Sequence, residues 1–233
     1  MPDVTPYEKL LVEKHTILSV VAGSRSFGLA TEASDTDRRG VYAAPTRDFW
    51  RLAKPPRHVA GPLPEQFSWE VERFCELALA GNPNLLEVLH SPQVERCTEL
   101  GAELRALAPA FLSRRVHRTF GRYADSQLAK AQRRLDREGA PKWKHVLHLL
   151  RLLLSAGELL RTGAMDIDAG PHRDRLLAVG RGEVPWPRIT AWRAELTAAL
   201  DAALPASPLP EEPDGERVQA WLVSVRSRGL AGG

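Results

Sequence analysis

The sequence has 233 residues, of which 43% are hydrophobic and 26% are charged, as in an ordinary globular protein. This length suits one large domain or two small ones, and it is long enough to bury a hydrophobic core. The formal net charge of +3 is too small to indicate nucleic-acid binding by itself. No apolar run is long enough to span a bilayer, and the two cysteines are not spaced as a disulfide framework. We therefore expect a cytoplasmic protein with no membrane partner.

The N-terminal region predicts a helix followed by a buried strand. Residues 5–14 have an amphipathic pattern that begins with a good capping residue and a proline. The apolar run at 17–22 has the length of a buried strand. Gly23 and Ser24 end this run, and consecutive amides in such a turn can wrap phosphate oxygens. A plain strand-ending turn is the alternative for these two residues.

Two aspartates precede the next apolar run, at 41–44. Asp35 and Asp37 are two residues apart, and in an extended chain such residues point to the same side. Two like charges that converge at one point repel each other, and a divalent cation removes this repulsion. Hard oxygen ligands suit magnesium. The pair therefore indicates a metal site at the mouth of a strand.

The Gly-Ser turn followed by Asp-Thr-Asp at 35–37 resembles the signature of the DNA polymerase beta-like nucleotidyltransferase superfamily. The longer string, from Gly-Ser-Arg-Ser-Phe-Gly at 23–28 to Ser-Asp-Thr-Asp-Arg-Arg-Gly-Val-Tyr at 34–42, resembles one branch in particular. That branch is the bacterial and phage predicted nucleotidyltransferases associated with RNA ligases and RNA repair. The resemblance implies that the Gly-Ser turn cradles the phosphates of a nucleoside triphosphate. It also implies that the Asp-x-Asp pair binds two magnesium or manganese ions.

A nucleotidyltransferase of this kind also needs a third carboxylate, which accepts the proton of the attacking hydroxyl or holds the metal. Relatives that this chain resembles carry an acidic residue nine positions before the phenylalanine that matches Phe74, and this position is Glu65. The family residue is usually Asp, so Glu65 is a departure; we predict it as both a catalytic residue and a metal ligand. Glu70 is the alternative, although in the first turn of a helix it would favour the helix dipole. Glu87, in a Gly-Asn-Pro-Asn-x-x-Glu string that also matches the family, is a further residue that could approach the site.

Five other side chains are candidates for nucleotide binding. Arg25 and Ser26 lie in the loop after the Gly-Ser turn, and a surface role is the alternative for Arg25. Farther along, Lys144, His148 and Arg151 share one face of a predicted helix. This positive stripe would suit a triphosphate if the helix packs across from the carboxylates. The alternative is that His148 is a hydrogen-bonded core residue and the two cations are superficial.

The sequence from about residue 98 onward predicts mostly helices, with basic residues crowded in the middle of the chain. Those residues are Arg114, Arg115, Arg118, Arg122, Lys130, Arg133, Arg134, Arg137, Lys142, Lys144, Arg151 and Arg161. A solvated helix face and a polyanion-binding face are both compatible with them. Tyr123, Gln127 and Lys130 lie on one face of a predicted helix. A second Asp-x-Asp, at 166–168, lacks an upstream strand with Gly-Ser, so we interpret it as a loop.

These observations together predict an α+β fold with two domains. A small mixed β-sheet nucleotidyltransferase domain at 1–95 precedes an α-helical domain at 96–233 with C-terminal helices, and the active site lies in the cleft between them. The expected reaction is metal-dependent transfer of a nucleoside monophosphate from a nucleoside triphosphate to an acceptor hydroxyl, with pyrophosphate release. An RNA end, bound through the basic central region, is one acceptor; a protein or a small molecule is another. The same residues are also compatible with a non-catalytic nucleotide-binding module, or with a hydrolase that uses the same metals.

Overall fold

The computed structural model describes residues 4–32 and 34–231 of the chain. A mixed five-stranded sheet forms the N-terminal part and a helical region follows it, which confirms the predicted α+β class. The strands are β1 (Thr16–Ala22), β2 (Asp37–Tyr42), β3 (His58–Ala60), β4 (Gln66–Glu70) and β5 (Val94–Cys97). The α-helices are α1 (Pro6–His15), α2 (Val71–Leu79), α3 (Pro83–His90), α4 (Glu99–Ala106), α5 (Arg115–Glu138), α6 (Trp143–Thr162), α7 (Arg173–Gly180), α8 (Trp186–Ala203) and α9 (Gly215–Ala231). Short 3₁₀ helices lie at η1 (Gly23–Arg25), η2 (Thr46–Trp50), η3 (Ala108–Phe111) and η4 (Gly170–His172).

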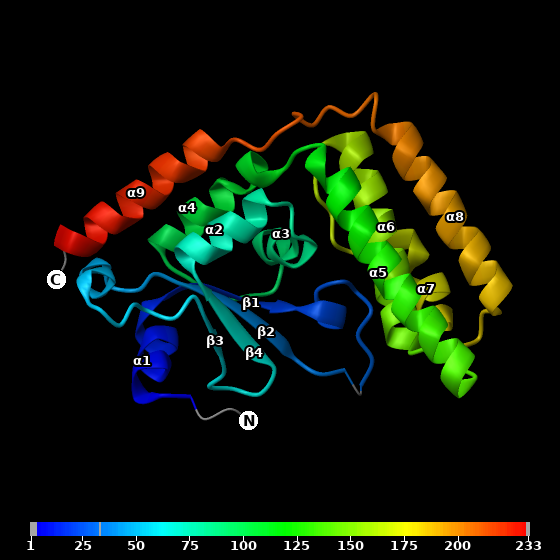
Figure 1. Ribbon diagram of the computed structural model, residues 1–233, viewed down its shortest axis with the longest axis horizontal. Helices are drawn as coiled ribbons and strands as arrows, with labels where there is room; N and C mark the ends of the chain where they lie inside the picture. Colours follow the sequence, from blue (N-terminus) through cyan, green and yellow to red (C-terminus); the bar gives the residue numbers. More distant parts are fainter. Residues whose placement is uncertain (1–3, 33, 232–233) are drawn as a thin grey trace.

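The sheet has the order β3-β4-β2-β1-β5 (Figure 1). Strands β2 and β4 are parallel, and the other neighbours are antiparallel. The pairing of β1 with β2 sets Ala22 opposite Asp37. The end of the first strand therefore lies beside the start of the second, although a long loop separates the two in sequence.

Side chains on β2 alternate between two cores, as the period of a strand requires. Val41 is fully buried in the main core, which includes α2, α3 and the long helices. Tyr42, its neighbour, is fully buried in a smaller cluster with Leu11 and Val12 of α1. Because Asp37 shares the parity of Val41, it lies on the face of the sheet that meets the main core.

The helical half is built around α6, a helix whose leucines are buried on most sides. Leu149, Leu150, Leu152 and Leu153 all belong to the main core. Helix α5 packs along α6 as a hairpin, and α7 and α8 cover it on other sides (Figure 1). Within the described residues, no helix combines the length and the apolar character needed to cross a membrane.

The last helix, α9, returns from the helical half to pack on α2 and η2 (Figure 1). The linker that leads to it is held by Arg114, whose guanidinium donates to the carbonyls of Ser207 and Leu209 at 2.7 and 3.0 Å. Strand β5 carries the sheet as far as Cys97, close to the predicted division at residue 95. The two-domain division itself stays a prediction.

Candidate functional site

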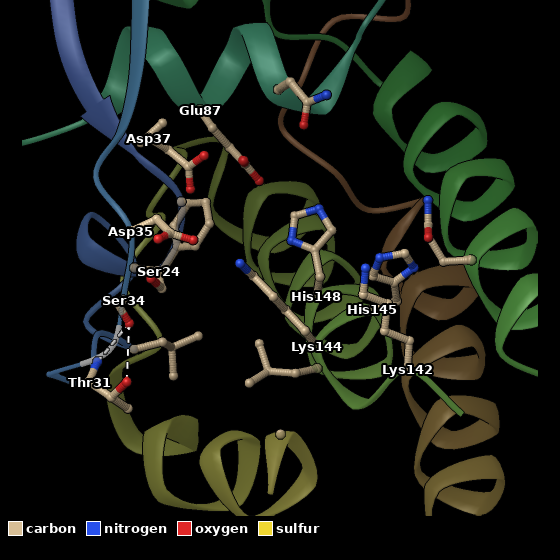
Figure 2. Close-up of a pocket in the computed structure, with 18 of the residues that line it drawn as sticks. Ser24, Thr31, Ser34, Asp35, Asp37, Glu87, Lys142, Lys144, His145 and His148 are labelled. Carbon is tan, nitrogen blue, oxygen red and sulfur yellow. Dashed lines mark hydrogen bonds between the residues drawn. The ribbon is translucent and has the colours of Figure 1, made fainter. Parts of the chain in front are cut away.

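A cleft of about 920 Å³ opens between the sheet and the helical half. Its lining residues on the sheet side and α3 are Ala22, Gly23, Ser24, Phe27, Leu29, Thr31, Ser34, Asp35, Asp37, Arg39, Phe67, Trp69, Asn84 and Glu87. Those on the helical side are Tyr123, Gln127, Lys130, Lys142, Lys144, His145, Leu147, His148, Leu177, Gly180 and Arg181. Figure 2 shows Ser24, Asp35 and Asp37 across from Lys144 and His148, with the Lys144 ammonium pointing toward the aspartates.

The Gly-Ser turn touches the second aspartate. Gly23 has a φ of +70°, a conformation that glycine adopts readily and other residues resist. A Cβ atom at this position would lie only 2.3 Å from Oδ2 of Asp37. The turn itself is closed by the amides of Ser26 and Phe27, which donate to the Gly23 carbonyl at 3.1 and 3.2 Å. A glycine is thus required here for two reasons, the backbone angle and the close approach of the carboxylate.

Of the two predicted loop ligands, Arg25 holds the loop that carries the first aspartate, and Ser26 closes the turn at Gly23. The guanidinium of Arg25 donates to the carbonyls of Ser34 and Asp35 at 2.8 and 3.2 Å. Ser26 is buried, and its hydroxyl donates to the Gly23 carbonyl at 3.2 Å. Neither residue lines the cleft, whereas Gly23 and Ser24 do. The contacts of Arg25 and Ser26 therefore position the backbone around the cleft.

The aspartate pair fits a hard divalent cation. Asp35 and Asp37 both line the cleft, and their carboxylates are the oxygen donors that Mg²⁺ or Mn²⁺ takes. Arg39 contacts only Oδ1 of Asp37, at 3.2 Å, and Oδ2 lies against Gly23. In the described residues no cluster of three His, Cys, Asp or Glu side chains has metal-binding geometry. Asp35 and Asp37 are thus the pair that would hold metal at this site.

The side chain of the predicted third carboxylate, Glu65, does not line the cleft, although its backbone lies beside Asp37 in the parallel pairing of β2 with β4. Glu65 is exposed, has a φ of 53° and does not line the cleft; its carbonyl accepts from the amide of Arg38 at 3.0 Å. Glu70 is buried, and both oxygens of its carboxylate have partners within the protein. It accepts from the Glu72 amide at the start of α2 at 2.8 Å, and it forms a bidentate ion pair with Arg226. Glu70 is thus held by Arg226. Glu65 lies next to Asp37 through its backbone, since Arg39 donates both to the Glu65 carbonyl at 2.8 Å and to Oδ1 of Asp37 at 3.2 Å. The catalytic role of Glu65 stays a prediction.

The stripe predicted on α6 divides into two parts. Lys144 and His148 line the cleft, whereas the side chain of Arg151 is only 1% exposed and lies behind them. Arg151 donates through Nη2 to Oε1 of Glu87 at 2.6 Å and to Nδ1 of His148 at 3.3 Å. Since an arginine only donates, Nδ1 of His148 accepts and the neutral ring carries its proton on Nε2. Burial, assisted by the charges of Arg151, His145 and Lys144, lowers the pKa of His148 to about 3.

The helical side of the cleft is strongly basic. Lys130, Lys142 and Lys144 line it, and none of the three forms an ion pair with another described residue. Burial is the main cause that lowers the pKa of the nearby His145, and the charges of Lys142 and Lys130 add to it. Such a surface attracts anions.

A scan against protein families matches residues 9–224 to the RNA repair pathway DNA polymerase beta family. The chain belongs to this family. The match confirms the resemblance carried by the Gly-Ser turn and the Asp-x-Asp pair, and it indicates a polymerase beta-like nucleotidyltransferase. Searches of curated proteins and of solved structures gave no significant match.

The second Asp-x-Asp of this family member has a structural role. Asp166 accepts from the amide of Asp168 at 2.9 Å, and Asp168 accepts from the amide of Gly170 at 2.7 Å. The Asp168 carboxylate lies so close to Gly28 that a Cβ there would be 2.9 Å from it. Arg173 also donates to the Gly28 carbonyl at 2.8 Å. These contacts join the loop after β1 to the helical half of the molecule.

Sequence patterns identified part of the cleft and missed another part. Tyr123, Gln127 and Lys130, which the helical period sets on one face, all line the cleft. Phe67 and Trp69 line it as well, with ring centroids 4.8 Å apart, because they alternate on β4. The alternation of aromatic residues at 67 and 69 is the sequence signal that could have found them.

Proposed function

We propose that this protein transfers a nucleoside monophosphate from a nucleoside triphosphate to an acceptor hydroxyl and releases pyrophosphate. The observation that carries the proposal is the contact between Asp37 and Gly23 at one end of a basic cleft. It brings the Asp-x-Asp pair and the Gly-Ser turn, which are separate in sequence, to one place.

The aspartates and the turn have complementary tasks in this proposal. Asp35 and Asp37 hold Mg²⁺ or Mn²⁺, which when bound neutralises phosphate charge and lowers the pKa of the acceptor hydroxyl. The backbone of Gly23 and Ser24 donates to phosphate oxygens. The positive φ of Gly23 allows this close approach of backbone to ligand.

The opposite side of the cleft binds the triphosphate tail. Lys144 points toward the aspartates and stabilises the charge that develops on pyrophosphate (Figure 2). His148 is neutral, so its Nε2 donates a hydrogen bond to a phosphate oxygen without adding charge. Arg151 acts from behind, because its contacts with His148 and Glu87 fix both side chains. Phe67 and Trp69 offer flat surfaces on which a base can stack.

The acceptor that best fits the charge distribution is an RNA end. The cleft-facing residues of α5 end with Lys130, and the helical period continues the same stripe through Arg134 and Arg137. Lys142, at the start of α6, extends the basic surface on the neighbouring helix. A chain of phosphates could follow this stripe out of the cleft. The RNA repair designation of the family points in the same direction.

Label transfer tests the reaction and the acceptor together. Each of the four nucleoside triphosphates, labelled at the α-phosphate, is incubated with Mg²⁺ and with RNA strands, a protein mixture or small hydroxyl compounds. We expect label on RNA with wild-type protein and none with Asp35→Ala/Asp37→Ala. Transfer that is equal with the double variant contradicts the proposal, and transfer only to protein or to a small molecule rejects RNA as the acceptor.

Salt dependence provides a second test of the RNA acceptor. Each phosphate contact contributes about 0.7 to the slope of log affinity against log salt for a single strand. Lys130→Ala/Arg134→Ala should therefore weaken RNA binding and reduce that slope by about 1.4. Fluorescence anisotropy with a labelled strand measures both quantities. A slope near zero for the wild type would favour a small acceptor.

A further inference from the structure

Glu87 brings a carboxylate into the cleft from a helix, not from the sheet. Helix α3 is capped by Asn82, whose side chain accepts from the amide of Asn84 at 3.0 Å. Asn84 and Glu87 are three residues apart, so they share one helix face, and both line the cleft. The intervening Leu85 and Leu86 are buried in the main core. Figure 2 shows the Glu87 carboxylate pointing from α3 into the cleft that Asp37 also lines.

Arg151 holds the Glu87 carboxylate in place through a buried ion pair. Its Nη2 lies 2.6 Å from Oε1 of Glu87, and the side chains are 1% and 6% exposed. The guanidinium also sits 3.5 Å from the centre of the Phe27 ring, which restricts its position. Within the described residues, Nε and Nη1 of Arg151 have no hydrogen-bond partner. Arg151 thus makes one ion pair, and that pair sets the orientation of Glu87.

Stability alone does not account for this ion pair. Removing two charges from water costs so much that a buried pair is often no more stable than apolar side chains of similar volume. Here the pair lies between the leucine-rich core and the cleft, with both side chains almost fully buried. Only Oε1 of Glu87 is used by Arg151, and Oε2 accepts no hydrogen bond from a described residue. One oxygen is therefore free to meet a substrate.

The surroundings of Glu87 also suit a proton acceptor. Burial raises its pKa, and the neighbouring Arg151 opposes that rise. A carboxylate with a raised pKa takes a proton more readily than an exposed one. Glu65 and Glu70, the two carboxylates predicted for this task, lie outside the cleft or are bound to Arg226.

We propose that Glu87, positioned by Arg151, is the residue that accepts the proton of the acceptor hydroxyl. This inference rests on the nucleotidyl transfer proposed above. In that step the acceptor oxygen forms a bond to the α-phosphorus while its proton passes to Oε2 of Glu87. The bond from the α-phosphorus to the bridging oxygen breaks, and its electron pair leaves with pyrophosphate. Arg151 is a positioning residue that does not touch the substrate.

Two glutamate variants separate this assignment from the one based on sequence. The single-turnover rate of label transfer to RNA is measured for wild type, Glu87→Gln and Glu65→Gln, together with the affinity for a non-hydrolysable triphosphate analogue. We expect Glu87→Gln to slow transfer by about 100-fold or more while the analogue binds within about threefold of wild type. Transfer that stays at the wild-type rate in Glu87→Gln overturns the inference. So does a loss of rate in Glu65→Gln with a normal rate in Glu87→Gln.

A double variant guards against a folding defect. Glu87→Gln/Arg151→Met removes both charges, so it leaves no buried charge unpaired. We expect it to melt cooperatively and to be as slow as Glu87→Gln; a rate equal to wild type overturns the inference. Arg151→Lys should recover part of the rate that Arg151→Met loses, because it restores a cation beside Glu87. If the wild type itself transfers no nucleotide to any acceptor, the proposed function fails and this inference fails with it.

Discussion

Gly23 affects both the conformation of the backbone and the position of a carboxylate in the cleft. Gly23→Ala would force a side chain into a φ of +70° and against Oδ2 of Asp37. We expect a loss of about 1–3 kcal/mol in the free energy of unfolding from the backbone alone. Activity should fall much further, because Asp37 must move to admit the methyl group. Urea unfolding and label transfer measure the two effects.

Gly157 provides the matched control for that substitution. It lies within α6, and a Cβ added there would meet no atom within 4 Å. Gly157→Ala should keep full activity and gain up to about 1 kcal/mol from helix propensity. If Gly23→Ala behaved like Gly157→Ala, the contact with Asp37 would not matter to the site.

His148 gives a prediction about pH. Its pKa is lowered to about 3, mainly by burial, whereas the unfolded chain has an ordinary histidine near 6.5. Between these values the unfolded state binds the extra proton, so the stability contributed by neutral His148 is lost as pH falls. The slope reaches about 1.4 kcal/mol per pH unit.

Replacing His148 with asparagine isolates its contribution to the pH dependence of stability. His148→Asn should flatten the dependence of unfolding free energy on pH between about 6.5 and 4 relative to wild type. The other histidines remain in both proteins, so the difference between the two curves reports on His148. Parallel curves would show that the pKa of His148 is the same in the folded and the unfolded protein.

Helix α9 packs on α2 and η2 and stabilises the sheet half of the molecule. Arg226 reaches from it to Glu70, which is 4% exposed, with distances of 2.9 and 3.0 Å. Arg226→Ala would leave the Glu70 charge buried and unpaired, so we expect a destabilisation of about 3 kcal/mol or more. Arg228→Ala, on the same helix, removes a half-exposed pair with Glu103 and should cost at most about 1 kcal/mol. Equal midpoints for the two variants in thermal unfolding would contradict this account.

At the scale of elements, sequence periodicity predicted much of the fold. The apolar run at 17–22 is strand β1, and the capping pattern before it is helix α1 with its predicted cap at Thr5. The short strands β3 and β5 were not predicted, because β3 has three residues and all of β5 is exposed. Neither strand therefore has an apolar pattern that could be read.

The site residues that form a local sequence motif were predictable. Those whose role depends on contacts between distant helices and strands were less so. The Gly-Ser turn and the aspartate pair are local patterns, and both line the cleft. The roles of Glu70, Glu87 and Arg151 depend on which helix lies across from which strand. Arg226, the partner of Glu70, is 156 residues away in sequence, and no local rule connects them.

The whole molecule is two halves that close around one cleft. The loop at 23–31 on the sheet side and the start of α6 at 143–148 both contribute to it. A ligand that touches both sides should slow amide hydrogen exchange in both segments at once. We expect this protection with a triphosphate analogue and Mg²⁺ together, and no change in α1, which packs on the opposite face of the sheet. Protection confined to one side would mean that the ligand does not bridge the cleft.

The most direct test of the account is the rate of pyrophosphate release by Asp37→Asn. This substitution keeps the shape of the side chain beside Gly23 and removes only its charge. With a nucleoside triphosphate, Mg²⁺ and the RNA acceptor, the account predicts release by the wild type and a fall of at least about 100-fold in the folded variant. Release at the wild-type rate by Asp37→Asn would contradict the claim that this carboxylate serves the chemistry of the cleft.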